Sequence, residues 1–128
     1  MREPEFLTPA IIEQLHDDSL TLFGGSAGVR DRGLVESALA SARNTYLYGR
    51  GDVFEIAATY AFHLSEAQAY LDGNKRTAVA AALTLLKGNG VILRIDNTAI
   101  YDAMIAIAEK RTTKTDLAAI FRTNASLI

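Results

Sequence analysis

The residues best suited to chemistry form one short polar segment, DGNKRT at 72–77, which precedes an almost wholly apolar stretch. The first turn of a helix presents unpaired backbone N–H groups and a partial positive charge. Lys75, Arg76 and the amide of Asn74 add to that end, so the segment predicts a site for an anion or a phosphate. Asp72 would be repelled by a polyphosphate unless a hard cation such as Mg²⁺ bridges them, an arrangement common in phosphoryl transfer.

The same segment also has a purely structural interpretation. Asp72 or Asn74 would then only cap a helix, and Lys75 and Arg76 would be solvated charges at its end. Basic residues near a helix N-terminus are mildly unfavourable but common, so spacing alone does not choose between the two interpretations. A Walker-type phosphate loop is excluded, because it requires Gly, four residues and then Gly-Lys-Ser/Thr.

Six helices are expected to position this segment, which predicts an all-α class. Thr8, Asp31 and Asp52 are side-chain acceptors of the kind that cap helix starts. The segment from Val53 to Leu64 is apolar on nearly every face, which is typical of a central helix. The expected helices are Pro9–Phe23, one containing 34–39, Val53–Leu64, Lys75–Lys87, one from Asp96 or Asn97 to Ala108, and one capped by Thr115 that runs to Arg122. Residues 44–51 are expected to form a loop or a short hairpin, and residues 91–95 a short extended link.

Length and composition predict one globular domain over residues 1–128. The chain has 49% hydrophobic residues, 22% charged residues and no Cys, which excludes disulfides and Cys-based metal sites. A formal net charge of -2 creates no basic field for nucleic acid. The longest apolar run, 78–86, is too short to span a bilayer, and the acidic N-terminus is unlike a secretory signal. We therefore expect a cytoplasmic protein with neither a membrane nor a nucleic-acid partner.

The sequence QAYLDGNKRT at 68–77 resembles the signature of the Fic/Doc superfamily, His-x-Phe-x-Asp-Gly/Ala-Asn-Lys-Arg-Thr, in its death-on-curing (Doc) form. The resemblance implies the compact, all-helical Fido fold. It also makes residues 46–51 a candidate for the flap that receives an extended target segment, with an ordinary loop as the alternative. Further segments look like Doc-type sequence and cover most of residues 6–123, namely 7–9, 23–25, 28–31, 34–39 and 89–91.

The resemblance implies an activity as well. Fic proteins usually transfer AMP from ATP to a protein hydroxyl, whereas Doc, in which Lys replaces a second glycine, transfers the γ-phosphoryl group. Lys75 places this chain on the Doc side. The implied function is that of a toxin that uses Mg²⁺ and ATP to phosphorylate elongation factor Tu or another translation protein, and that a small antitoxin silences. Transfer of AMP stays an alternative.

Position by position, the resemblance assigns roles within the polar segment. It assigns Asp72 to the Mg²⁺, and it assigns Gly73 and Asn74 to the turn that holds the anion. Lys75 and Arg76 become the phosphate clamps.

Two positions depart from the family signature. Tyr70 replaces a Phe whose ring packs into the core, a mild change if the added hydroxyl finds a partner or reaches solvent. Gln68 replaces the His that acts as general base, and an amide cannot accept a proton near neutral pH. Loss of a general base costs on the order of 10² to 10⁴ in rate. We therefore expect a weak or inactive transferase with an intact phosphate site.

Three explanations of Gln68 stay open: natural divergence to a non-catalytic or differently acting protein, a detoxifying substitution, and another group that serves as base. A protein that only binds a nucleotide, an antitoxin or a translation factor is therefore the second function hypothesis. His63 is expected to be a packed or helix-terminal histidine and His16 a surface one, so neither is a good replacement base.

Overall fold

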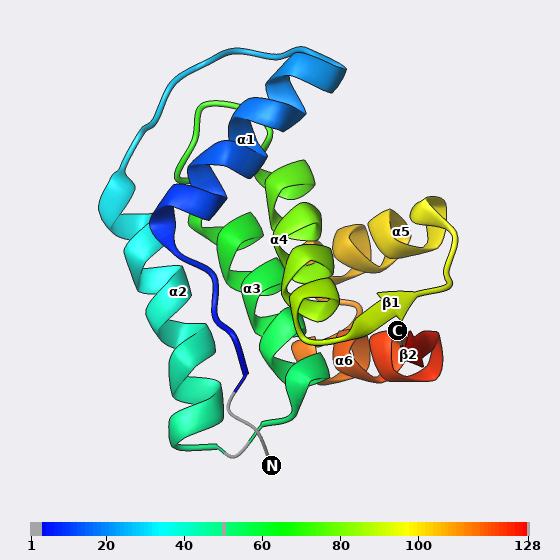
Figure 1. Ribbon diagram of the computed structural model, residues 1–128. Helices are drawn as coiled ribbons and strands as arrows, with labels where there is room; N and C mark the ends of the chain where they lie inside the picture. The colour runs from blue at the N-terminus through cyan, green and yellow to red at the C-terminus, as the bar shows by residue number, and fades with distance from the viewer. Residues whose placement is uncertain (1–3, 50, 128) are drawn as a thin grey trace.

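The computed structural model describes residues 4–49 and 51–127, and most of these residues are helical (Figure 1). The all-α class is confirmed, and the six expected helices are all present within these ranges. In the same ranges, no helix combines the length and the apolar character that crossing a bilayer requires. In chain order the elements are α1 (Pro9–Phe23), α2 (Arg32–Leu47), α3 (Val53–Ala67), α4 (Asn74–Gly88), β1 (Val91–Leu93), α5 (Asn97–Ala108), α6 (Lys114–Thr123) and β2 (Ala125–Leu127).

Helix α3 is the centre of the structure, as its sequence predicts. Every side chain from Ile56 to Ala61 is buried, and such a run covers all faces of a helix. Helices α2, α4, α5 and α6 all contact α3, while α1 packs against α4 and α2. Figure 1 shows α2 on one side of the α3 and α4 pair, with α5 and α6 on the other side. The apolar sequence of α3 is thus explained by partners all around it.

Local signals set most of the helix starts. The side chains of Thr8, Asp31 and Asp52 each accept a backbone N–H from the first turn of α1, α2 and α3, at 2.9 to 3.3 Å. Gly24, with φ of 76°, ends α1 and donates its N–H to the carbonyl of Leu20. These caps can be predicted from sequence because each side chain acts on its own neighbours.

Residues 44–51 differ from the expected loop or hairpin. Helix α2 continues to Leu47 and a short turn follows, while Arg50 lies outside the described residues. The Tyr46 ring meets the edge of the Phe6 ring, with 5.8 Å between their centres. A tertiary contact therefore stabilises a last helical turn that local propensity does not favour.

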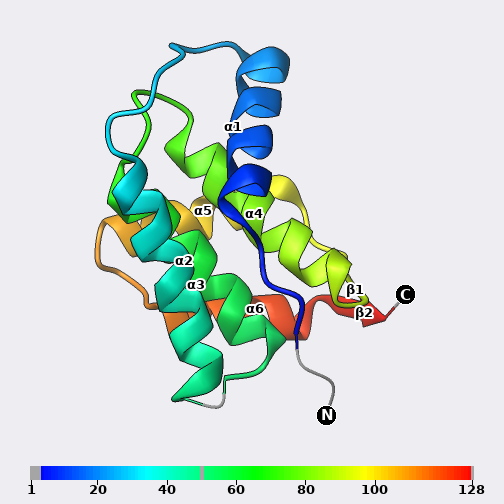
Figure 2. The ribbon, with the colours of Figure 1, turned by 60° about the vertical axis from the view of Figure 1, so that its left-hand side comes forward.

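The position of this end of α2 also differs from that of a flap. Figures 1 and 2 both show it at the opposite end of the molecule from the connection between α3 and α4, which contains the polar segment. The arrangement of the helices therefore does not place residues 46–49 beside that connection, as a flap would require.

Two more differences concern α6 and the end of the chain. The N-cap of α6 is Thr113 and not Thr115, because the Thr113 hydroxyl accepts the Asp116 N–H at 3.2 Å and the Asp116 carboxylate accepts the Thr113 N–H at 3.3 Å.

Residues 125–127 form β2, which pairs antiparallel with β1, the extended link expected at 91–95. A strand of three residues is too short for its period to be recognised in the sequence.

Thr113→Ala is expected to lower the free energy of unfolding by about 1 kcal/mol, because Ala leaves first-turn N–H groups without a side-chain acceptor. Thr115→Ala is the matched control, since the same chemical change then falls inside the helix, where Ala is the better helix former. Urea denaturation followed by circular dichroism measures both variants. Equal losses would contradict the assignment of Thr113 as the cap.

Candidate functional site

The polar segment predicted from sequence forms the turn between α3 and α4. Gln68 ends α3 in the left-handed region, with φ of 53° and ψ of 42°, and the left-handed Gly73 immediately precedes α4. The turn and the first residues of α4 surround a cavity of about 300 Å³. The structure brings all the predicted site residues together there, in a lining of Gln68, Leu71, Asp72, Gly73, Asn74, Lys75 and Arg76.

Asn74 holds the shape of this turn. Its Oδ1 accepts the Tyr70 N–H at 3.0 Å, and its Nδ2 donates to the Tyr70 carbonyl at 2.9 Å and to Gln68 Oε1 at 3.5 Å. The residue is buried, with 8% of its surface exposed. Because the side-chain amide is engaged within the turn, Asn74 can meet an anion only through its backbone N–H, at the positive end of α4.

Asp72 is exposed, yet both of its carboxylate oxygens accept a backbone N–H. Oδ1 accepts from Gly73 at 2.8 Å and Oδ2 accepts from Ser26 at 3.1 Å. The Ser26 and Gly73 hydrogen bonds, with smaller contributions from the charges of Arg76 and His16, lower the pKa of the Asp72 carboxyl below its ordinary value. The carboxylate is therefore ionised at neutral pH, as a ligand of a hard cation has to be.

The number of acidic ligands limits which metal this site can hold. Within residues 4–49 and 51–127, no three His, Cys, Asp or Glu side chains gather in a metal-binding group. A cation on Asp72 would take its other ligands from water and phosphate oxygens. That donor set suits Mg²⁺ and not a structural zinc ion.

A glycine-containing segment, residues 24–31, runs beside the turn. The Arg30 N–H donates to the Ala69 carbonyl at 2.7 Å, and the Leu71 N–H donates to the Gly28 carbonyl at 3.2 Å, which forms a short antiparallel bridge. Sequence reasoning identified the glycines as a loop but did not place the loop against the polar segment. No local signal could have done so, because the partners lie about forty residues apart in the sequence.

Gly25 permits this close approach. Its φ is 119°, and a Cβ added there would lie 2.6 Å from Asp72 Oδ2 and 3.1 Å from Asp72 Cγ. Such a Cβ would displace the carboxylate from the Ser26 N–H. Glycine is therefore required at position 25 for both its conformation and its small size.

Arg76 is partly buried and is held by the end of α1. Its Nε donates to Ser19 Oγ at 3.0 Å, and its Nη2 donates to the Gly24 carbonyl at 3.1 Å. The guanidinium carbon lies 5.4 Å from the centre of the Phe23 ring, within the range of a cation–π contact. Lys75 lines the same cavity and has no hydrogen-bond or ion-pair partner among the described residues. The segment therefore offers one pre-oriented cation and one that is free to meet a ligand.

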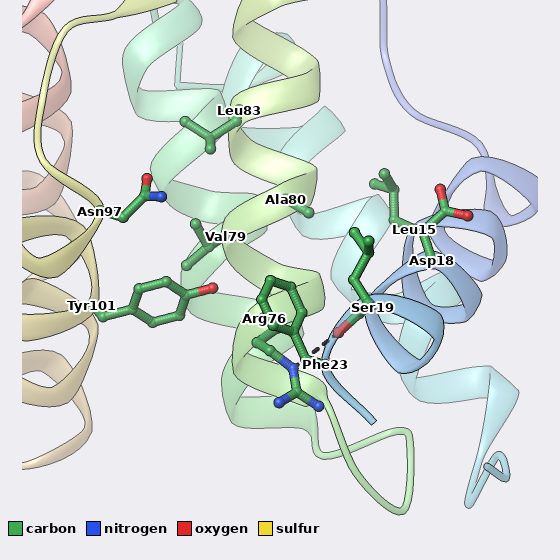
Figure 3. A pocket seen from close by; sticks show the side chains of 11 residues that line it. Leu15, Asp18, Ser19, Phe23, Arg76, Val79, Ala80, Leu83, Asn97 and Tyr101 are labelled. Carbon is green, nitrogen blue, oxygen red and sulfur yellow. Dashed lines mark hydrogen bonds between the residues drawn. The ribbon is translucent and has the colours of Figure 1, made fainter. Parts of the chain in front are cut away.

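A second cavity of about 280 Å³ lies between α1, α4 and α5 and also has Arg76 in its wall (Figure 3). Burial raises the pKa of the Tyr101 phenol in this wall, so the hydroxyl stays protonated and can donate a hydrogen bond. The apolar lining of this cavity includes Leu15, Phe23, Val79 and Leu83. A ligand bound by Arg76 would therefore have a mainly apolar space beside it.

Gln68, at the position expected for the general base, serves the structure of the turn. Its Nε2 donates to the Ser65 carbonyl at 2.8 Å in the last turn of α3, and its Oε1 faces the Asn74 amide. A neutral side-chain amide cannot take a proton at neutral pH. Gln68 can therefore hold the turn but cannot act as a general base.

His16 corrects the expectation of a surface histidine. Only 3% of its surface is exposed, its ring stacks on that of Tyr70 with 3.7 Å between centres, and its Nε2 lies 2.8 Å from the Asp72 carbonyl oxygen. A sequence signal for this burial does exist, because His16 lies four residues after Ile12 and four before Leu20, within the apolar stripe of α1. Ile12 and Ser19, on the same face, are also buried. Sequence reasoning placed His16 on the surface and so missed this signal.

His63 matches its prediction, whereas Tyr70 matches only in the burial of its ring. His63 is packed against α6, where its Nε2 lies 3.2 Å from Lys114 Nζ, and burial together with the charge of Lys114 lowers its pKa. The Tyr70 ring is buried, as the family pattern requires. Its hydroxyl oxygen is buried and has no hydrogen-bond partner in the described part of the chain, so it meets neither condition set for a mild change, a partner or access to solvent. The residue lines a cavity of about 150 Å³ with Glu13 and Arg32.

Comparisons with known proteins find relatives whose similarity includes this region of the chain. A family model described as the Fic/DOC family matches residues 6–86, which include α1 to α3, most of α4 and the whole turn. The chain is similar to Protein kinase doc of Escherichia phage P1, with 34% identity over 86 residues that span 66% of this chain and 68% of that protein. It is also similar to Toxin Doc of Mycolicibacterium smegmatis, with 44% identity over 77 residues, 58% of either chain.

Gly25→Ala is expected to raise the pKa of the Asp72 carboxyl toward its ordinary value of 3.8, because the new Cβ displaces Oδ2 from the Ser26 N–H. Gly24→Ala is the matched control: its φ is also positive, at 76°, but no atom lies within 4 Å of an added Cβ. NMR titration of the Asp72 carboxyl measures both variants. An unchanged pKa in Gly25→Ala would show that the hydrogen bond does not hold the carboxylate.

The direction of this pKa shift also sets its effect on stability. A carboxyl whose pKa is lower in the folded protein stabilises the fold above its unfolded pKa, and this contribution is lost as the pH falls through the folded pKa. The contact between Asp72 and Ser26 is therefore expected to be intact at neutral pH and to weaken only below about pH 4.

Proposed function

This chain belongs to the Fic/DOC family, and on that premise we propose that it is a Doc-like toxin that transfers a phosphoryl group from Mg·ATP to a protein hydroxyl. The proposed target is a translation protein such as elongation factor Tu, in the cytoplasm, and an antitoxin protein is the proposed partner that silences the toxin. We further propose that transfer is slow in this form, because Gln68 occupies the position of the general base. The observation that carries the proposal is the convergence of Asp72, Lys75 and Arg76 on one cavity at the start of α4.

The start of α4 supports the phosphate part of the proposal. The first-turn N–H groups of a helix lack intrahelical partners and point at a ligand. Lys75 is available to pair with phosphate oxygens, and Arg76 is already oriented by Ser19 and Gly24. In phosphoryl transfer, positioning and charge stabilisation supply most of the catalysis, and groups fixed in advance need no reorganisation.

The ionised carboxylate of Asp72 supports the metal part of the proposal. Its depressed pKa keeps it charged, and its exposed position lets it share a cation with phosphate oxygens. When bound, Mg²⁺ would neutralise charge on the transferred phosphoryl group. Hydrogen bonds from the Gly73 and Ser26 N–H groups orient the Asp72 carboxylate.

Gln68 also supports a second candidate, a Fic/DOC-family protein that binds a nucleotide, an antitoxin or a translation factor without catalysis. The two candidates can be separated by restoring the base. His is one of the residues enriched in left-handed backbone, so the φ of 53° at position 68 accepts His as readily as Gln. The variant Gln68→His therefore changes the chemistry of the turn with little backbone strain.

Saturating Mg·ATP is expected to raise the melting temperature, because a ligand at about 100 times its Kd adds about 2.7 kcal/mol to the free energy of unfolding. Asp72→Ala is expected to remove the Mg²⁺-dependent part of this rise and to leave a smaller, metal-independent part. Asp102→Ala, which removes an exposed acid from α5, is the control and keeps the full effect. Thermal melts with ATP, with and without Mg²⁺, test all three proteins. A melting temperature that Mg·ATP does not move in the unmodified protein contradicts the phosphate-site assignment.

Gln68→His is expected to modify elongation factor Tu about 10² to 10⁴ times faster than the unmodified protein, because it restores a general base. Intact mass of elongation factor Tu after incubation with Mg·ATP measures the product. A gain of one phosphoryl group supports the kinase, and a gain of one adenylyl group would change the assignment to AMP transfer. No gain with either protein, and no growth arrest by Gln68→His in cells, would favour the non-catalytic candidate.

A further inference from the structure

His16 contacts the functional turn at two points, although it lies more than fifty residues away in the sequence. Its ring stacks on Tyr70, with 3.7 Å between centres and 10° between planes, and its Nε2 lies 2.8 Å from the Asp72 carbonyl oxygen. We propose that His16 is a positioning residue, which orients the Asp72 carboxylate and the start of α4 for the metal and the phosphates. The inference rests on the proposed function, because Asp72 is the metal residue there.

The direction of the hydrogen bond is determined by its acceptor. A backbone carbonyl can only accept, so the proton lies on Nε2 of His16 and the imidazole is the donor. Only 3% of the surface of His16 is exposed, and the parallel stack on Tyr70 fixes the plane of the imidazole ring. The donor is therefore held in one orientation.

A rigid peptide plane carries this orientation to the carboxylate. The carbonyl of Asp72 and the N–H of Gly73 belong to one planar unit and point in opposite directions, so fixing one fixes the other. His16 holds the carbonyl, and the Gly73 N–H donates to Asp72 Oδ1 at 2.8 Å. Without the imidazole donor, this peptide plane is free to rotate, and the Gly73 N–H no longer points at the Asp72 carboxylate.

The same imidazole also packs behind the start of α4. A Cβ built on Gly73 would lie 3.5 Å from His16 Cδ2, so the ring lies beside the left-handed residue that precedes the helix. Ser19, three residues along the same face of α1, holds Arg76 at 3.0 Å. One helical face thus orients both the proposed metal residue and the proposed phosphate clamp.

The alternative is a histidine that only fills space in the core, and two variants separate these roles. His16→Phe keeps the stacking ring and loses the donor, whereas His16→Gln loses the stack and keeps an N–H donor. His63→Phe is the matched control, because it removes the other histidine, whose contacts are with Phe62 and Lys114. Circular dichroism and the melting temperature establish that each variant is folded.

The first readout is ATP affinity with and without Mg²⁺, measured by calorimetry. Loss of a group that orients a metal ligand typically costs ten- to a hundredfold in metal affinity. In His16→Phe, we expect the affinity for ATP to fall at least about tenfold when Mg²⁺ is present and to change little when it is absent. In His16→Gln, we expect a smaller fall in the presence of Mg²⁺. A folded His16→Phe with the Mg²⁺ dependence of the unmodified protein overturns the proposal, as does greater loss in His16→Gln than in His16→Phe.

The second readout does not need a nucleotide. Hydrogen exchange of the Gly73 amide, followed by NMR, is expected to speed up at least about tenfold in His16→Phe and to be unchanged in His63→Phe. Unchanged exchange in His16→Phe overturns the proposal. If the unmodified protein shows no Mg²⁺-dependent ATP binding, the proposed function fails, and the Gly73 exchange rate alone then decides whether His16 positions the turn.

Discussion

The connection between α3 and α4 must bring polar backbone into a helical bundle without leaving its hydrogen-bonding groups unpaired, and the Asn74 side chain meets this requirement for both backbone groups of Tyr70. It contacts the backbone of Tyr70 twice and the side chain of Gln68 once. A buried donor or acceptor left unpaired costs about 1 to 3 kcal/mol, and left-handed residues such as Gln68 persist only where their surroundings hold them. The hydrogen bonds on the buried side of the turn thus leave the exposed Asp72 carboxylate and the start of α4 able to face a ligand.

Two other parts of the chain support the turn from outside. Helix α1 contributes one face, on which His16 meets the turn and Ser19 meets Arg76. The glycine segment 24–31 contributes backbone hydrogen bonds, among them the one that its Ser26 N–H donates to the Asp72 carboxylate. Charged groups that are oriented before a ligand arrives need less reorganisation when it binds, and this is the main electrostatic advantage available to a site for phosphoryl transfer.

Gln68 separates the shape of the site from its chemistry. The residue ends α3, donates to the Ser65 carbonyl and meets Asn74, so position 68 contacts the rest of the turn without a histidine there. A neutral amide nonetheless cannot take a proton from a target hydroxyl. The proposed toxin and the proposed binding protein therefore share one geometry and differ only in whether position 68 can accept a proton.

The sequence alone determined the all-α class, the central helix and the starts of three helices, because caps such as Thr8 and Asp31 act on residues two or three positions away. It also determined which polar residues gather at the start of α4, since neighbours in a turn stay neighbours in space. Tertiary structure decided the contacts of His16 with the turn, the last turn of α2 and the packing of the glycine segment 24–31 on the turn. Each of these depends on contacts between residues far apart in the sequence, where local propensity and periodicity carry no information about the partner.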